Sequence, residues 1–183
     1  MGDSDELWRW SARQLAHGIA TGQVSAREAV ESCLGRVDAA NQKLNALVEV
    51  PREEALQAAA EADQLTASGA ELGPLHGVPV AIKVNSDQAG HATTNGVAAF
   101  RDSIAATDSS QVRNLRRSGA IFVGRSNTPA FSYRWVTSND LHGRTLNPWD
   151  ASRTPGGSSG GASSAVASGM VPVAHGNDIG GSI

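Results

Sequence analysis

The chain has 183 residues, of which 40% are hydrophobic and 18% charged, a composition typical of an ordinary soluble globular domain or of part of a larger one. Its formal net charge of −3 and its pI of about 5.9 argue against a nucleic-acid partner. A single cysteine, Cys33, excludes an internal disulfide and fits a reducing, cytoplasmic location, and no apolar run approaches the roughly 20 residues of a membrane span.

Residues 1–70 are predicted to form a helical scaffold. The spacing of apolar residues predicts a first helix over residues 5–20. Ser25 and Glu28 form a capping-box pattern, which predicts the start of a second helix. One face of that second helix is apolar and is expected to be buried: it carries Ala29, Val30, Cys33, Leu34 and Val37.

A short strand over residues 44–50 and an alanine-rich third helix over residues 52–67 complete this region.

The composition of the chain changes at Gly73, where glycine and proline become frequent. Residues 80–84 form an apolar run typical of a buried strand, interrupted by Lys83. A buried lysine is costly unless it is paired or neutral. Lys83 therefore either pairs with an unseen acid, reaches the surface, or has a chemical role.

A strand–helix–strand pattern follows. Residues 87–108 show no clear period and are predicted to form a long loop. A cap at residues 108–110 predicts a helix through Arg116 that ends at Gly119, and residues 120–124 are predicted to form the next strand. Such a βαβ unit predicts an α/β fold with a parallel pair of strands.

Two glycine-flanked serine motifs stand near the end of the chain. The first is Gly-Gly-Ser-Ser-Gly-Gly at residues 156–161, and the second is Asp-Ile-Gly-Gly-Ser at residues 178–182. Ser182 follows Ser158 by 24 positions. Glycine at this density lets the backbone adopt positive φ and approach a ligand closely. A flexible linker has a similar composition, but a linker would not run through the apolar residues 170–174.

Lys83 after an apolar strand, followed by these two serine motifs in this order, resembles the amidase signature family. The resemblance extends from about Gly73 to the last residue. It implies an α/β fold with a mixed β-sheet flanked by helices, incomplete in this chain. It also implies an amidase, which hydrolyses a carboxylic amide through a Ser–Ser–Lys triad.

Two departures from the family pattern matter. Many members carry an acidic residue directly after the lysine, where this chain has Val84 and Asn85. Members also continue for hundreds of residues beyond the second serine motif. We therefore expect residues 1–183 to be the N-terminal part of a single amidase domain, with a catalytic core segment over residues 73–183, and to be inactive alone.

The resemblance implies a role for each site residue. Ser182 would be the nucleophile that carries the acyl group, Ser158 the bridging serine in a cis peptide, and Lys83 the general base. A serine hydroxyl needs a base, and lysine acts as one only when neutral, which burial favours. The oxyanion hole would consist of backbone N–H groups, those of Ile179, Gly180 and Gly181. We predict a small-molecule amide substrate, no cofactor, no metal, and neither a membrane nor a nucleic-acid partner.

Alternatives stay open. Ser159 fits the G-x-S-x-G elbow of an α/β-hydrolase-type esterase, although His175 and Asp178 follow too soon and in the wrong order. The glycine-rich turn also suits a non-catalytic phosphate-binding module, and membership of an aminoacyl-tRNA amidotransferase complex is a third possibility. Substrate preference and homo-oligomer formation are undetermined. The tryptophans are interpreted as packing residues. Four residues could line the site or pack, and packing is favoured for each: His91, Asn95, Trp135 and His175.

Overall fold

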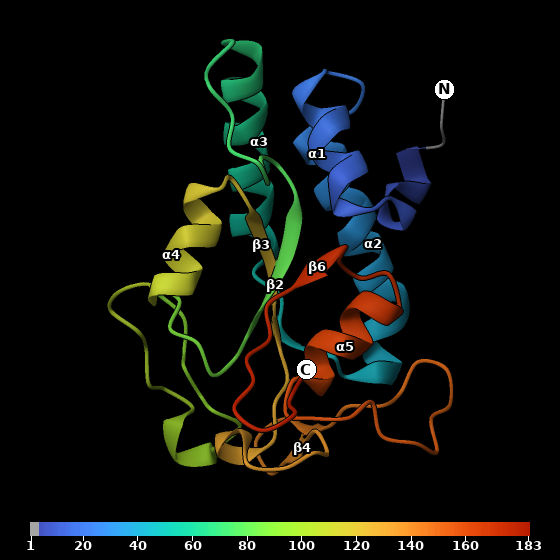
Figure 1. Ribbon diagram of the computed structural model, residues 1–183, viewed down its shortest axis with the longest axis vertical. Coiled ribbons are helices and arrows are strands. Elements are labelled where there is room, and N and C mark those ends of the chain that lie inside the picture. Colours follow the sequence, from blue (N-terminus) through green and yellow to red (C-terminus); the bar gives the residue numbers. More distant parts are fainter. Residues whose placement is uncertain (1–3) are drawn as a thin grey trace.

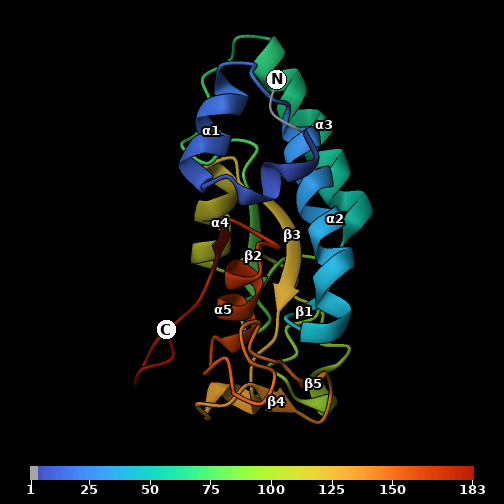
Figure 2. The same ribbon diagram turned by 90° about the vertical axis from the view of Figure 1, so that its right-hand side faces the viewer.

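A four-stranded sheet in the order β1–β3–β2–β6 forms the centre of the computed structural model, which describes residues 4–183 (Figure 1). β2 (Pro79–Lys83) pairs in parallel with β3 (Ile121–Ser126) and with β6 (Val173–Ala174). β1 (Leu47–Glu49) pairs antiparallel with β3. Helices cover both faces: α2 and α3 lie on one side of the sheet and α4 and α5 on the other (Figure 2). The predicted α/β class with a mixed sheet is confirmed.

The N-terminal helices begin at capping residues. The predicted single helix over residues 5–20 is wrong, because the chain forms a 3-10 helix, η1 (Ser4–Arg9), and then α1 (Ala12–Ala20). Ser11 separates the two elements, since its extended backbone and its capping box with Gln14 start a new helix. Residues 1–3 lie outside the described part of the chain.

α2 (Ala26–Leu44) starts after Ser25 with the predicted capping box, and all five residues of its predicted apolar face are buried. Burial raises the pKa of the Cys33 thiol to about 12. α2 continues to Leu44 and ends at Asn45 in a left-handed conformation, so the predicted strand over residues 44–50 is shorter than expected.

α3 (Arg52–Ala67) has the predicted bounds and packs against α2. α4 (Ser110–Arg117) joins β2 to β3 and confirms the βαβ unit. No helix within residues 4–183 is long and apolar enough to cross a membrane.

The predicted loop between β2 and α4 is fastened to the scaffold. It contains one 3-10 turn, η2 (Ala98–Phe100), and one isolated bridge between Ala92 and Ile104. The His91 imidazole is buried and contacts carboxylate oxygens of Glu49 on β1 and Glu54 on α3. His91 is therefore a packing residue, as predicted.

The remaining elements follow β3. They are η3 (Ala130–Ser132), the short hairpin of β4 (Ser138–Asn139) and β5 (Gly143–Arg144), and α5 (Gly160–Ala167). The sequence predicted no helix at α5, because its small residues carry no apolar period. Its glycines matter because the helix lies against other backbone: a Cβ at Gly161 would stand 2.5 Å from the Asn127 carbonyl oxygen and 2.7 Å from that of Ala46.

This close approach predicts opposite effects for two glycine substitutions. Gly161→Ala should lower the free energy of unfolding by about 1–3 kcal/mol, because the facing atoms are backbone and cannot move aside. Gly35→Ala, in the middle of α2, should raise it by up to about 1 kcal/mol, because a methyl there meets no atom within 4 Å and alanine favours the helix. Urea unfolding midpoints of the two variants and the parent check this, and equal midpoints for the variants would contradict the effect of packing.

Candidate active site

Lys83 is the last residue of β2, and its side chain is fully buried. The amino group donates to three neutral oxygens: Nζ lies 2.6 Å from Ser158 Oγ, 3.0 Å from Ser159 Oγ and 2.8 Å from Asn177 Oδ1. Within residues 4–183 no carboxylate forms an ion pair with this amine, and the side chain does not reach the surface. Neither an ion pair nor exposure at the surface therefore accounts for this buried lysine.

Burial lowers the pKa of Lys83 to about 8, and the nearby Asp178 carboxylate acts in the opposite direction. Desolvation disfavours the ammonium, and the hydroxyl and amide acceptors compensate only in part because they carry no charge. A measurable fraction of this lysine is therefore a neutral amine near neutral pH. A neutral amine at 2.6 Å from a serine hydroxyl can accept its proton.

The sheet brings the two serine motifs together. β6 pairs with β2, and the His175 N–H donates to the Ala81 carbonyl at 2.8 Å. This pairing brings the segment that follows β6 next to Lys83. The Ser159 N–H then donates to the Ser182 carbonyl at 3.1 Å, which joins the first motif to the second. The Gly157–Ser158 peptide bond is cis, as the family resemblance implies.

Ser182 lies at this junction and is 8% exposed. Among the described residues, its hydroxyl has no hydrogen bond to Ser158 or to Lys83. The contact between Lys83 and Ser158 is thus present, whereas the contact from Ser158 to Ser182 is not formed in this structure. Ser159, the alternative nucleophile, contacts Lys83 instead of a histidine–carboxylate pair.

The turn around Gly180 is an anion-binding nest. The Asp178 carboxylate accepts backbone N–H groups from Gly180 at 2.8 Å, Gly181 at 2.5 Å and Ile183 at 3.1 Å. The N–H groups of Ser182, Gly181 and Gly180 lower the pKa of Asp178 to about 2. Consecutive N–H groups that converge in this way bind negatively charged oxygen. Two of the three predicted oxyanion donors belong to the nest, whereas Ile179 contributes no N–H and its side chain is exposed.

A surface hollow of about 400 Å³ opens beside Ser182. Its wall includes Trp135, which is 72% exposed, so the interpretation of Trp135 as a packing residue is wrong. Trp149 is also exposed, at 84%. The sequence of these loops does not reveal that no helix or strand among residues 4–183 packs over the two rings. The hollow combines glycine backbone and two serines with three apolar side chains: it is lined by Trp135, Pro155, Gly156, Gly157, Ser163, Gly180, Gly181, Ser182 and Ile183.

The other two residues interpreted as packing residues lie within the structure rather than in this hollow. Asn95 adopts a positive φ of 51° and its carbonyl accepts the Phe131 N–H, so it shapes a turn. His175 is half-buried, and burial, followed by the charge of Lys83, lowers its pKa.

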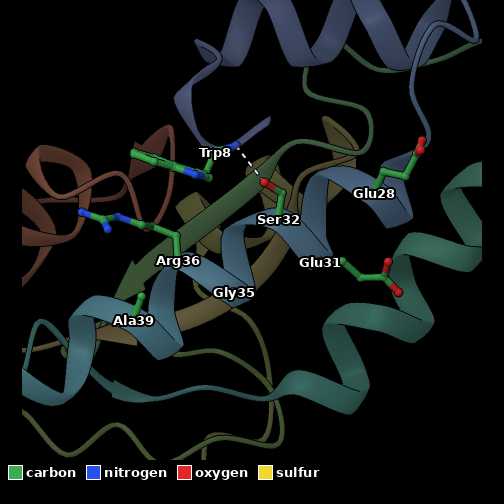
Figure 3. A pocket seen from close by; sticks show the side chains of 7 residues that line it. All are labelled: Trp8, Glu28, Glu31, Ser32, Gly35, Arg36 and Ala39. Carbon is green, nitrogen blue, oxygen red and sulfur yellow. Dashed lines mark hydrogen bonds between the residues drawn. The ribbon is translucent and has the colours of Figure 1, made fainter. Parts of the chain in front are cut away.

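A second hollow of about 440 Å³ lies along α2 beside Trp8, and Lys83 is not among the residues that line it (Figure 3). Its two carboxylates already have partners: Glu28 completes the capping box with Ser25, and Glu31 pairs with Arg27 at 2.8 Å. Both carboxylates serve the helix, so we place the candidate active site at Lys83 and not here.

Asn177 is a site residue that the sequence did not reveal. Its side-chain amide contacts Lys83 and is paired with the amide of Asn85, two residues after the lysine. The one available signal was the presence of Asn85 close behind Lys83 in a chain that lacks the acidic residue of many family members.

Comparisons with known proteins agree with this geometry. A family model described as Amidase matches residues 28–183. The indoleacetamide hydrolase of Bradyrhizobium diazoefficiens is 55% identical over 97% of this chain and 34% of that protein. A glutamyl-tRNA(Gln) amidotransferase subunit of Carboxydothermus hydrogenoformans is 41% identical over 97% of this chain and 37% of that protein. A solved fatty acid amide hydrolase superposes with a TM-score of 0.94 at 30% identity, over 100% of this chain and 32% of that one. The chain spans about a third of the length of these relatives.

The lowered pKa of Lys83 predicts a pH-dependent cost to stability. Between its ordinary pKa of 10.5 and about 8, the unfolded chain binds a proton at Lys83 that the folded protein does not. The free energy of unfolding therefore falls as the pH drops through this window, and the loss is complete below about pH 8. Lys83→Met removes this contribution, so its stability relative to the parent should rise by about 3 kcal/mol from pH 10.5 to pH 8 and then stay constant.

Denaturant unfolding of both proteins at several pH values measures this difference. Lys43→Met, at the exposed end of α2, is the matched control and should differ from the parent by the same amount throughout. A Lys83→Met difference that is equally independent of pH would show that the buried amine is not destabilised.

Proposed function

The chain belongs to the amidase signature family, and from that premise we propose that its protein hydrolyses a carboxylic amide to an acid plus ammonia or an amine. The observation that carries the proposal is the buried Lys83 amine at 2.6 Å from Ser158 Oγ, which forms no ion pair with a carboxylate of the described residues. Ser182 is the proposed nucleophile, and its backbone carbonyl is joined to the first serine motif by the Ser159 N–H.

In the first half of the reaction, neutral Lys83 accepts the proton of Ser158, which accepts the proton of Ser182. The Ser182 oxygen forms a bond to the amide carbon, and the carbonyl oxygen becomes negatively charged. Collapse of this intermediate breaks the carbon–nitrogen bond. The proton returns from Lys83 through Ser158 to the departing nitrogen, which leaves an acyl ester on Ser182.

In the second half, water takes the place of the amine. Lys83 and Ser158 remove a proton from the water, its oxygen bonds to the acyl carbon, and the Ser182 oxygen leaves with the returning proton. The relay ends in the protonation state in which it began, so no cofactor is consumed.

The oxyanion is proposed to bind at the nest around Gly180. In the structure Asp178 already places a negatively charged oxygen against the N–H groups of Gly180 and Gly181. During turnover the carbonyl oxygen would replace this carboxylate as their acceptor. One such donor typically lowers the barrier by about 3–4 kcal/mol.

We propose a small amide with an aromatic acyl group as the substrate class. The relative named indoleacetamide hydrolase shares 55% identity with the chain, and the exposed Trp135 ring beside Ser182 offers a flat apolar contact for such a group. The relative named as a glutamyl-tRNA(Gln) amidotransferase component favours a second candidate, in which the same chemistry releases ammonia from glutamine for transfer in a complex.

Ammonia release separates the candidates. The protein at its natural length is incubated with an arylacetamide or with glutamine, and free ammonia is measured. Hydrolysis of the arylacetamide without a partner supports the first candidate, and glutamine hydrolysis that needs a partner supports the second.

Substitution of the relay predicts graded losses of amide hydrolysis. Lys83→Ala should lower kcat by about 10²–10⁴-fold, the usual contribution of a general base, and Ser182→Ala should abolish the acyl-enzyme. Ser159→Ala should remain active. A fluorophosphonate probe followed by intact mass should add one adduct to the parent and to Ser159→Ala, and none to Ser182→Ala. Labelling that is lost in Ser159→Ala but kept in Ser182→Ala would support the esterase elbow instead.

A further inference from the structure

We infer that Asn177 is a positioning residue for Lys83, whose amide oxygen holds one N–H of the amine and thereby turns the nitrogen toward Ser158. The inference rests on the proposed role of Lys83 as the base. It concerns a residue outside the Ser–Ser–Lys set, and it starts from the 2.8 Å contact between Lys83 Nζ and Asn177 Oδ1.

The hydrogen-bond donors of the amine are matched in number by oxygens. A protonated lysine has three N–H donors, and here three oxygens receive them, from Ser158, Ser159 and Asn177. A neutral amine has two N–H donors and one lone pair. A serine hydroxyl can reverse its role and donate, but an amide oxygen can only accept. Asn177 therefore accepts one N–H of Lys83 in both the protonated and the neutral state. The lone pair of the neutral amine must then point toward the serine hydroxyls.

The amide of Asn177 is itself held in place. Its Nδ2 donates to Asn85 Oδ1 at 3.1 Å, and Asn85 Nδ2 donates back to Asn177 Oδ1 at 3.3 Å and to Ser132 Oγ at 3.0 Å. The Ser132 hydroxyl also contacts Thr128 Oγ1 at 3.0 Å. These contacts hold both amides in place, and because the Lys83 ammonium can only donate, the end of the Asn177 amide that faces it is the oxygen.

The neutrality of the Asn177 amide matters for the charge of Lys83. A carboxylate at the place of Asn177 would pair with the ammonium and hold it protonated, whereas a neutral amide orients the amine and favours the ammonium much less. Asp178 also acts on Lys83 and raises its pKa. The half-buried imidazole of His175 precedes Asn177 by two residues, and burial, followed by the charge of Lys83, lowers its pKa. Both stay unchanged when Asn177 alone is substituted.

The test reads the titration of Lys83 directly. The protein at its natural length is labelled with ¹³C at the lysine ε carbon, and the signal absent from Lys83→Arg identifies Lys83. Asn177→Asp, nearly equal in shape, should move the titration midpoint of Lys83 up by about one pH unit or more. Asn177→Ala, which removes an acceptor that favours the ammonium, should move it down. Asn114→Asp, at an exposed position of α4, is the control and should leave it unchanged.

The same variants are assayed for amide hydrolysis across the pH range. The acidic limb of the kcat/KM profile should move with the Lys83 midpoint, upward in Asn177→Asp and downward in Asn177→Ala, and kcat should fall more than KM changes. A purely structural role would lower activity without moving the limb.

The two proposals fail in distinguishable ways. A Lys83 midpoint that is the same in both Asn177 variants and the parent overturns the positioning role, whatever the activity. A parent protein that hydrolyses no amide overturns the proposed function, while the NMR titration still decides whether Asn177 acts on Lys83.

Discussion

The burial of a single amine is the constraint on which the rest of this structure depends. β2 lies between β3 and β6, so Lys83 cannot leave the interior without breaking the sheet. A shift of its pKa from 10.5 to about 8 corresponds to a cost of about 3 kcal/mol at neutral pH. That cost is a large part of the usual net stability of a domain. The surrounding core of alanine, valine and isoleucine side chains has to offset it.

Glycine-rich segments are needed here because backbone must come close to backbone. The Ser159 N–H reaches the Ser182 carbonyl, and α5 lies so near Asn127 and Ala46 that no side chain fits at Gly161. Small residues bury less apolar area than large ones, but they allow the backbone segments to come this close. They explain why a stretch that resembles a flexible linker in composition is buried over much of its length.

The sequence predicted those parts of the fold and the site that depend on local signals. The Ser25 capping box and the apolar period indicate α2. The similar box of Ser11 with Gln14 was not predicted, and α5 has no apolar period. Lys83 and Ser158 were identified because they belong to recognisable motifs. Asn177 was not, because its role arises only when β6 pairs with β2 and carries it over Lys83. The exposure of Trp135 likewise depends on what the fold leaves uncovered.

The glycine turn also affects Lys83, because it holds the neighbouring Asp178 carboxylate. Asp178 lies next to Asn177 in the chain, and its carboxylate is the obvious partner for a buried ammonium. It instead accepts N–H groups of Gly180, Gly181 and Ile183, which leaves a neutral amide as the residue that touches Lys83. An ion pair would raise the pKa of the lysine and remove the neutral amine. In this structure the glycine turn therefore affects Lys83 as well, because the N–H donors that hold the Asp178 carboxylate keep it out of an ion pair with the lysine.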